Sequence, residues 1–181
     1  MSNFVINITR LPEGIREYQF EDIPGAIGLD DRFHYPVTVA VALTRSFNQF
    51  LIRARIQTIG TLECDRCLES FLMPIETDFS MVYSHENLTD LDIPSDSEFQ
   101  VLKPDANIID LGDDVRQYIQ LAVPQKLLCK EDCAGICPNC GKILNSDDCT
   151  CPNEEVDSPW EVLRRITIAE SNSDTGKQQM N

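Results

Sequence analysis

The stretch at residues 128–151, LCKEDCAGICPNCGKILNSDDCTC, holds six of the eight cysteines of this chain, and the other two lie far upstream in CDRC at 64–67. A tight turn can direct two closely spaced sulfurs at one metal ion. Because zinc takes four thiolates in a tetrahedron, four close pairs of cysteines predict two ions. The pairs are Cys64 with Cys67, Cys129 with Cys133, Cys137 with Cys140, and Cys149 with Cys151.

The spacing within the stretch predicts one compact ribbon site. In CPNCG at 137–141, Gly141 suits the left-handed conformation that closes a turn around a metal and points backbone N–H groups at the sulfurs. In CTC at 149–151, alternate side chains of an extended segment share a face. The predicted ligands are Cys137, Cys140, Cys149 and Cys151 for this site, and Cys64, Cys67, Cys129 and Cys133 for a second, long-range site.

The long-range site would join distant parts of the chain. CDRC lies between a strand predicted to end near Leu62 and a strand predicted to begin near Ser70, which places it at the tip of a hairpin. An ion there would clamp the sheet to the end of a predicted helix. It would also close a loop of about sixty residues, which costs entropy that the metal offsets.

Closely spaced cysteines can also be redox pairs or disulfides. A thioredoxin-like pair needs a helix directly after a strand, whereas CDRC is followed by a strand-like run. The N-terminus, MSNFVINITR, lacks the features of a secretory signal, so we expect a cytoplasmic protein, in which structural disulfides are rare. Zinc is therefore the favoured interpretation. Four thiolates leave the ion no open position for water, which indicates architecture rather than catalysis.

No pattern in the chain predicts an enzyme. There is no phosphate-binding glycine loop and no Gly-x-Ser-x-Gly elbow. His34 and His85 are isolated, without a partnered nucleophile, and are expected to be ordinary surface or core histidines. We expect a protein without catalytic residues.

Alternating apolar residues predict four strands. They lie at residues 4–10, at 36–44 and 49–60, which form a hairpin turning through RSFNQ, and at 71–83. Residues such as Ile52 should face the core, and those such as Arg53 should face solvent. Such a pattern is typical of an antiparallel sheet buried on one face.

Two other stretches read as irregular connections and one as a helix. Residues 10–34 are rich in Pro and Gly, and residues 85–109 are acidic and weakly periodic. Apolar residues then recur at helical spacing, with Asp110 as the cap and Pro124 as the stop.

The predicted fold class is α+β, a mainly antiparallel β-sheet or partly open barrel with one packed helix and a C-terminal zinc ribbon. The predicted units are a β-rich acidic domain at 1–126 with a helix near 111–123, a zinc-ribbon segment at 127–152, a short C-terminal helix at 153–168 and a disordered tail at 169–181.

The chain is strongly acidic, with 15 Lys and Arg against 30 Asp and Glu and a formal net charge of −15. No stretch approaches the roughly 18 uninterrupted apolar residues of a membrane span, so no membrane contact is expected. Residues 76–114 hold eleven acids and one base, Lys103. Such a surface attracts basic partners and repels phosphate backbones, although solubility alone can explain it. Arginines concentrate instead at 32–66, where they either solvate the outer faces of strands or bind RNA.

The chain resembles the YceD-like family of bacterial and plastid large ribosomal RNA subunit accumulation proteins. The resemblance implies a role in the accumulation or processing of large-subunit ribosomal RNA, in a family whose genes commonly neighbour that for a small basic protein of the large subunit. It rests on LECDRCLESF at 62–71, IDLGDDVRQYIQLAVPQKLLC at 109–129, DCAGICPNCGKILNSDDCTC at 132–151 and the closing SPWEVLRRI.

The leading hypothesis is a non-enzymatic, zinc-stabilised ribosome assembly factor. Its acidic body would hold a basic large-subunit ribosomal protein, or present it to the pre-ribosomal particle. The alternative is a zinc-ribbon protein that binds ribosomal RNA directly, for which the chain's net charge is unfavourable. A thiol oxidoreductase has almost no support in the residues. The arginines of the RNA-binding alternative are Arg45, Arg53, Arg55 and Arg66.

Overall fold

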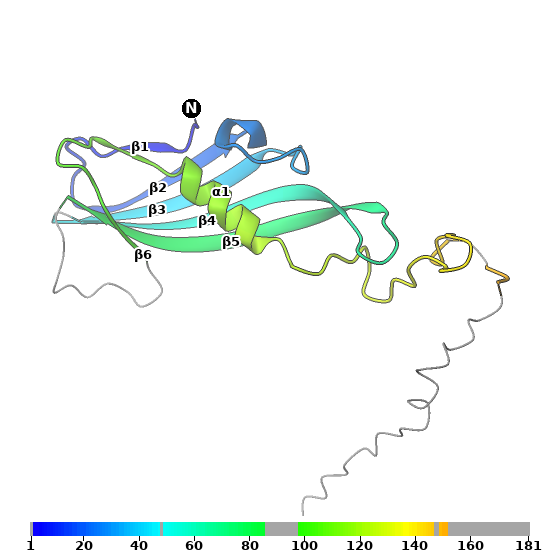
Figure 1. Cartoon of the computed structure of the whole chain (residues 1–181). Helices are drawn as coiled ribbons and strands as arrows, with labels where there is room; N and C mark the ends of the chain where they lie inside the picture. Colours follow the sequence, from blue (N-terminus) through cyan, green and yellow to red (C-terminus); the bar gives the residue numbers. More distant parts are fainter. Residues whose placement is uncertain (1, 48, 86–97, 147–148, 152–181) are drawn as a thin grey trace, which may run out of the picture.

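The computed structural model describes residues 2–47, 49–85, 98–146 and 149–151, and its centre is a five-stranded sheet in the order β2-β3-β4-β5-β6 (Figure 1). Strands β2 to β5 run antiparallel, and β6 pairs in parallel with β5. A separate two-stranded ribbon pairs β1 with β7. The strands are β1 (Val5–Asn7), β2 (Gly14–Asp22), β3 (Val37–Ser46), β4 (Gln49–Glu63), β5 (Ser70–Ser84), β6 (Glu98–Val101) and β7 (Ile108–Asp110).

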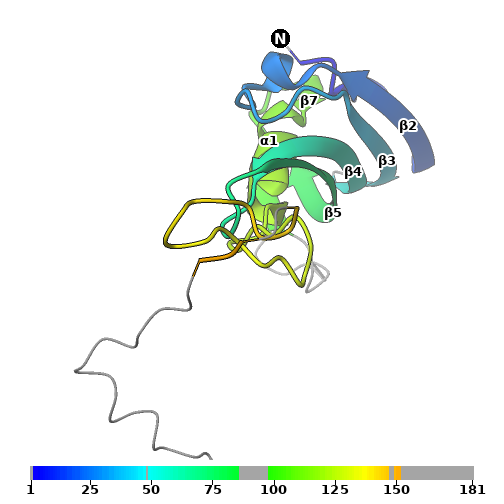
Figure 2. The same ribbon diagram turned by 90° about the vertical axis from the view of Figure 1, so that its right-hand side faces the viewer.

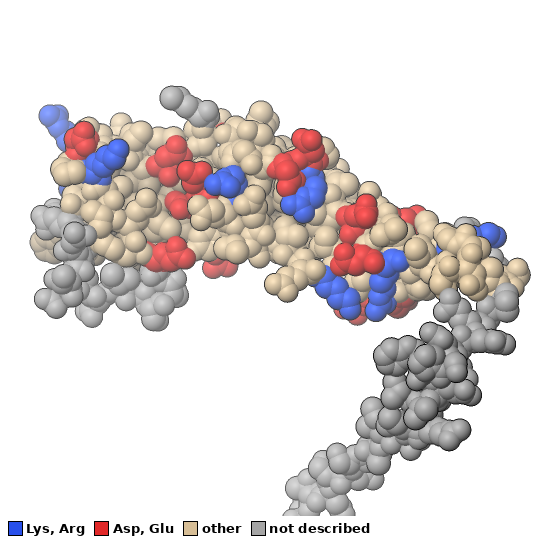
Figure 3. Space-filling model, in the orientation of Figure 1, with Lys and Arg blue, Asp and Glu red and all other residues tan. Residues whose placement is uncertain are grey.

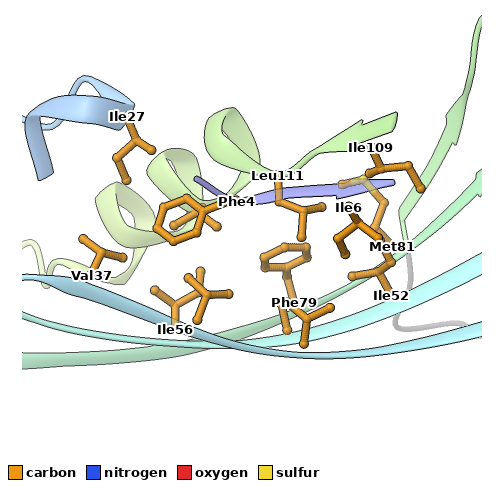
Figure 4. Close-up of a cluster of buried hydrophobic side chains, with 14 of the residues drawn as sticks. Phe4, Ile6, Ile27, Val37, Ile52, Ile56, Phe79, Met81, Ile109 and Leu111 are labelled. Atoms are coloured by element: carbon orange, nitrogen blue, oxygen red, sulfur yellow. The ribbon is translucent and has the colours of Figure 1, made fainter. Parts of the chain in front are cut away.

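The hydrophobic core lies between this sheet and a second layer. The second layer consists of helix α1 (Gly112–Ala122), a 3-10 helix (Pro24–Ile27) and the β1–β7 ribbon (Figures 1 and 2). Figure 4 shows Phe4 and Leu111 of the second layer facing Ile56 and Phe79 of the sheet, and all four side chains are buried. Alternate residues of a strand point to one face, which is why the predicted inward positions form a continuous apolar layer.

The opposite face of the sheet is open. Arg53, Arg55 and Gln57 of β4 are exposed there, as their alternation with buried neighbours predicted. The sheet is curved (Figure 2), yet its end strands β2 and β6 are not neighbours in the strand order of the described residues. Of the two predicted arrangements, the mainly antiparallel open sheet with one helix is therefore confirmed.

The predicted helix is also confirmed, with a small shift at its start. Leu111 occupies the N-cap position, and Asp110 acts one residue earlier, its Oδ1 accepting the backbone N–H of Gly112 at 2.9 Å. The helix ends at Ala122, shortly before Pro124, which has no N–H to continue it.

Two predicted connections were partly wrong. Residues 10–34 contain β2, whose nine residues pair with β3 along its whole length. Its first four residues are exposed, and only Tyr18 and Phe20 pack against the core, so β2 offers too short an apolar alternation to mark a strand in the sequence. Residues 85–109 contain β6 and β7, which are short and depend on pairing with β5 and β1. The predicted C-terminal helix and tail, 153–168 and 169–181, lie outside the described residues.

Candidate metal centres

The long β4–β5 hairpin places CDRC at its tip. The two strands pair continuously from Gln49 opposite Ser84 to Glu63 opposite Ser70, and the hairpin projects beyond the sheet and helix layers (Figure 1). The backbone N–H of Leu68 donates to the carbonyl of Cys64 at 2.9 Å and closes the turn. Leu68 has a φ of 62°, in the left-handed region that non-glycine residues rarely adopt.

Hydrogen bonds hold this tip against the segment that follows the helix. Asp65 donates its backbone N–H to the carbonyl of Leu127 at 2.8 Å, and its Oδ2 accepts the backbone N–H of Leu127 at 2.7 Å. This reciprocal pair aligns residues 127–133 with residues 64–67. It explains how cysteines far apart in the sequence come into contact. Cys67 and Cys129, for example, are 62 residues apart in the chain.

The first cluster consists of Cys64, Cys67, Cys129 and Cys133. The Sγ atoms of Cys64 and Cys133 are 3.8 Å apart, and those of Cys67 and Cys129 are 3.7 Å apart. All four sulfurs lie within 4.8 Å of one another. Three of the side chains are at most 2% exposed, and Cys129 is half-buried.

The second cluster consists of Cys137, Cys140, Cys149 and Cys151, and it is more exposed. Its turn closes when Gly141 donates its N–H to the carbonyl of Cys137 at 2.8 Å. Gly141 has a φ of 72°, the left-handed conformation predicted for it. The Sγ of Cys149 is 3.3 Å from that of Cys137 and 3.6 Å from that of Cys140, and the four sulfurs again lie within 4.8 Å of one another.

Both clusters have the dimensions of a tetrahedral zinc site. With Zn–S bonds of about 2.3 Å, the sulfurs at the corners of a tetrahedron are about 3.8 Å apart. The sulfur separations of 3.3, 3.6, 3.7 and 3.8 Å lie at or slightly below this value. The structure thus brings the eight predicted cysteines together in the two predicted sets of four, and each set could hold a metal ion.

Backbone dipoles around the sulfurs favour thiolates at one position in each cluster. Burial disfavours the charged form of Cys64, but hydrogen bonds from the backbone N–H groups of Cys129, Cys67 and Arg66 outweigh it and lower the pKa of Cys64 to about 6. The backbone N–H of Cys140 is the main cause that lowers the pKa of Cys137 to about 6. Further charges in so small a space repel one another, and a divalent cation removes that repulsion.

One further thiol in each cluster is shifted in the opposite direction. Burial raises the pKa of Cys129 to about 12, and the neighbouring thiol of Cys133 adds to the effect. In the second cluster, the thiols of Cys149 and Cys140 raise the pKa of Cys151 to about 12. Without a cation, these groups therefore stay protonated at neutral pH, and metal binding at either cluster would release protons.

Asn145 is a functional candidate that the sequence did not reveal. Its Nδ2 donates to the Sγ of Cys133 at 3.1 Å, and its Oδ1 accepts the backbone N–H of Ala134 at 2.9 Å. The bond to sulfur is the main cause that lowers the pKa of Cys133. Asn145 lies between Cys140 and Cys149 in the chain, so a residue of the ribbon segment supports a ligand of the other cluster. No spacing rule for cysteine ligands points to it.

The first cluster has a small core of its own. Its buried cysteines pack with Phe71, Leu128 and Ile143, separately from the main core between sheet and helix. The expectation that an ion here clamps the sheet to the end of the helix becomes more specific. The sheet and helix are held by the main core, and the cluster ties the hairpin tip to the segment at 127–145.

The four arginines of the RNA-binding alternative do not form one surface. Arg53 and Arg55 are neighbours on the open face of β4. Arg66, at the hairpin tip, donates from Nη1 to the carbonyl of Cys133 at 2.8 Å. Arg45 lies near the end of β3, where it pairs with Phe50 at the start of β4, far from the tip of the β4–β5 hairpin. A strand of the length of β4 spans about 50 Å, so Arg45 and Arg66 cannot contact one short ligand together.

Comparisons with known proteins place most of the chain in one family. The model of the family described as "Large ribosomal RNA subunit accumulation protein YceD" matches residues 52–167. A chloroplast protein of Arabidopsis thaliana, named large ribosomal RNA subunit accumulation protein YCED homolog 1, is 25% identical over 155 residues, covering 72% of this chain and 48% of the relative. The Zea mays protein of the same name is 26% identical over 148 residues, covering 67% of this chain and 50% of the relative.

An uncharacterized protein of Mycobacterium tuberculosis is 27% identical over 122 residues, covering 67% of this chain and 56% of that protein. The chain thus spans about half the length of the curated relatives it matches. No solved structure matches it. Among the described residues, no helix has the length and apolar character needed to cross a membrane. The family match covers both halves of the β4–β5 hairpin and all eight cysteines, and the chain belongs to the YceD family of large ribosomal RNA subunit accumulation proteins.

Proposed function

We propose that this protein is a non-enzymatic, zinc-stabilised ribosome biogenesis factor that supports large-subunit ribosomal RNA accumulation by handling a basic ribosomal protein. The family membership carries the proposal, because the family is named for accumulation of the large-subunit RNA. The two four-cysteine clusters and the distribution of acidic residues suggest how the chain would act.

The clusters favour an architectural role for zinc. Each would bind one ion through four thiolates, which leaves no coordination position for a substrate or an activated water. When bound, zinc would supply a cross-link of fixed geometry. The protein's part is to arrange the thiolates, through the Asp65–Leu127 pairing in the first cluster and the Gly141 turn in the second. The hairpin tip and the ribbon segment would then present a rigid surface to a partner.

Acidic residues gather around the start of helix α1 and strand β6. Tyr118 donates its hydroxyl to Glu98 at 3.1 Å, and Tyr83 donates to Asp114 at 2.8 Å. Burial raises the pKa of Asp114, and the charges of Asp113, Glu98 and Asp110 raise it further. Figure 3 shows several groups of Asp and Glu on the face of the molecule that carries α1. Carboxylates that repel one another in this way favour a basic partner, which would relieve the repulsion.

The test is capture of partners from a cell lysate with and without nuclease. The expected result is recovery of a small basic large-subunit protein that survives nuclease treatment and weakens with added salt, because exposed charges are screened over about 8 Å at physiological ionic strength. The variant Glu98→Gln with Asp113→Asn should reduce recovery. The matched control, Glu17→Gln with Glu21→Gln on the exposed face of β2, removes the same charge elsewhere and should not.

One observation favours the alternative of direct RNA binding. The open face of the sheet carries a groove of about 510 Å³ in which Arg53 and Arg55 lie opposite the small residues Ala42 and Ala40, and which Glu17 and Asp78 also line. Small side chains leave room for a ligand between longer neighbours. If nuclease removes every ribosomal protein from the capture, and Arg53→Gln with Arg55→Gln lowers the affinity of the purified protein for ribosomal RNA, this alternative replaces the first proposal.

A further inference from the structure

A second pocket, distant from both cysteine clusters, lies where the β3–β4 hairpin turns. Its volume is about 170 Å³. A water molecule occupies about 30 Å³ in the liquid, so the pocket has room for an ion of several heavy atoms. Four separate segments of the chain line it: the end of β1, the hairpin turn, the end of β5 and the loop before β7. Its lining residues are Ile8, Thr9, Arg10, Arg45, Phe47, Phe50, His85, Ala106 and Asn107.

The lining is cationic in a chain of net charge −15. Arg10 and Arg45 contribute positive charge, and the described residues that line the pocket include no Asp or Glu. Neither arginine forms an ion pair with any acidic residue in the parts of the chain that the structure describes. Glu13 is near the hairpin, but its Oε1 accepts the backbone N–H of Phe47 at 3.3 Å. Arginines that gather without carboxylates are expected to repel one another unless an anion joins them.

Arg45 provides an independent observation at this pocket. Its Nε is buried, and it has no hydrogen-bond partner among the described residues. Its guanidinium lies over the ring of Phe50, 5.8 Å from the centroid, which holds the group in place without satisfying its N–H donors. A buried donor without an acceptor costs free energy and is rare in native structures. An oxygen atom bound in the pocket would supply the acceptor.

The remaining polar groups also suit an oxyanion. The Nδ1 of His85 contacts the carbonyl of Lys103 at 3.0 Å, and because a carbonyl only accepts, Nδ1 carries a hydrogen. Two residues flanking the pocket, Arg10 and Phe47, have positive φ values of 51° and 47°. Strained backbone of this kind concentrates at binding sites, where the surrounding structure enforces it.

We propose that this pocket is a phosphate-binding site, in which Arg10 and Arg45 hold the phosphate group. Arginine's planar fork binds phosphate oxygens through paired hydrogen bonds, which fits a pocket with two arginines. The proposal is independent of the proposed function, because the pocket shares no residue with the cysteine clusters or with the acidic residues around α1. Arg10 and Arg45 also lie outside the region matched by the family model.

The test is a titration of the intact, metal-loaded protein with inorganic phosphate, followed by NMR of the arginine Nε–Hε signals. The Arg45 signal should shift saturably. Arg10→Gln, at an exposed position that the fold does not need, should weaken binding roughly tenfold, or about 1.4 kcal/mol. Arg45→Gln should weaken it at least as much. The matched control is Arg53→Gln, which removes the same charge from the open face of the sheet and should leave the affinity unchanged.

Competition then identifies the source of the phosphate. If a single-stranded RNA octanucleotide displaces inorganic phosphate and adenosine monophosphate does not, the pocket binds a phosphate of the nucleic-acid backbone. If the mononucleotide competes and the RNA does not, the pocket binds a small phosphorylated molecule. The proposal is overturned if inorganic phosphate causes no saturable shift, or if Arg53→Gln weakens binding as much as Arg10→Gln, since that result would indicate a general effect of charge.

Discussion

Replacing Cys64 by serine tests the division of the cysteines into two sites. The serine hydroxyl is a poor ligand for zinc, so the first cluster should lose its ion and the second should keep its own. The two Asp65–Leu127 hydrogen bonds, the Arg66–Cys133 hydrogen bond and the small core around Phe71 and Leu128 would then have to hold the hairpin tip to the segment at 127–133 without the ion. We expect this contact to open more often, because each hydrogen bond contributes only about 0.5–1.5 kcal/mol.

The structure sets the size of the effect. The tie between Cys67 and Cys129 spans 62 residues, and cross-linking a loop of that length removes unfolded-chain entropy worth about 4 kcal/mol at 25 °C. This value is an upper estimate, since a denatured chain retains some structure. A typical domain is stable by about 5–15 kcal/mol, so the loss is large but does not abolish folding. The main core between sheet and helix contains none of the cysteines and should persist.

Two measurements on the purified variants decide the outcome. Elemental analysis should find two zinc ions in the parent protein and one in each of Cys64→Ser and Cys149→Ser. Hydrogen exchange should accelerate at 64–68 and 127–133 in Cys64→Ser, but at 137–151 in Cys149→Ser, and helix α1 should stay protected in both. The division is refuted if either variant retains two ions. A loss of protection in α1 on replacing Cys64 would refute the separation of the two cores.

Three further results are expected. Asn145→Ala should lower the metal affinity of the first cluster roughly 10- to 100-fold in a chelator competition, because outer hydrogen bonds orient ligands, while the second cluster keeps its affinity. Asp114→Asn should raise the urea midpoint at pH 7 and leave it unchanged at pH 3. Because the pKa of Asp114 is raised in the folded state, its carboxylate destabilises the fold when it is ionised. This cost is absent at a pH below the ordinary carboxyl pKa and is complete once the pH exceeds the folded-state pKa. The metal-loaded protein should show only background activity in an insulin-reduction assay, since zinc-bound thiolates are protected from exchange; robust turnover would favour an oxidoreductase.

The sequence alone determined the features that depend on local pattern. The alternation from Val37 to Tyr83 identified the three long strands and the face that each buries. The cysteine spacings predicted the membership of the second cluster, because a turn of two residues and a conformation-specific glycine such as Gly141 restrict which sulfurs can meet, and the first cluster followed as the remaining four cysteines. These patterns can be recognised without knowledge of the tertiary contacts, because each relates residues that are close together in the chain.

Tertiary structure alone decided the features that depend on pairing. Strands β2 and β6 pair with the longer strands β3 and β5, and β7 pairs with the equally short β1, while their own residues carry little periodicity. Asn145 reaches the sulfur of Cys133 only after the ribbon segment has folded back. Arg10, Arg45 and His85 converge from distant segments into one pocket. The apolar periodicity of a strand shows in the sequence which of its faces is buried. The neighbours of a polar side chain depend instead on how the layers pack, and that packing involves the whole chain.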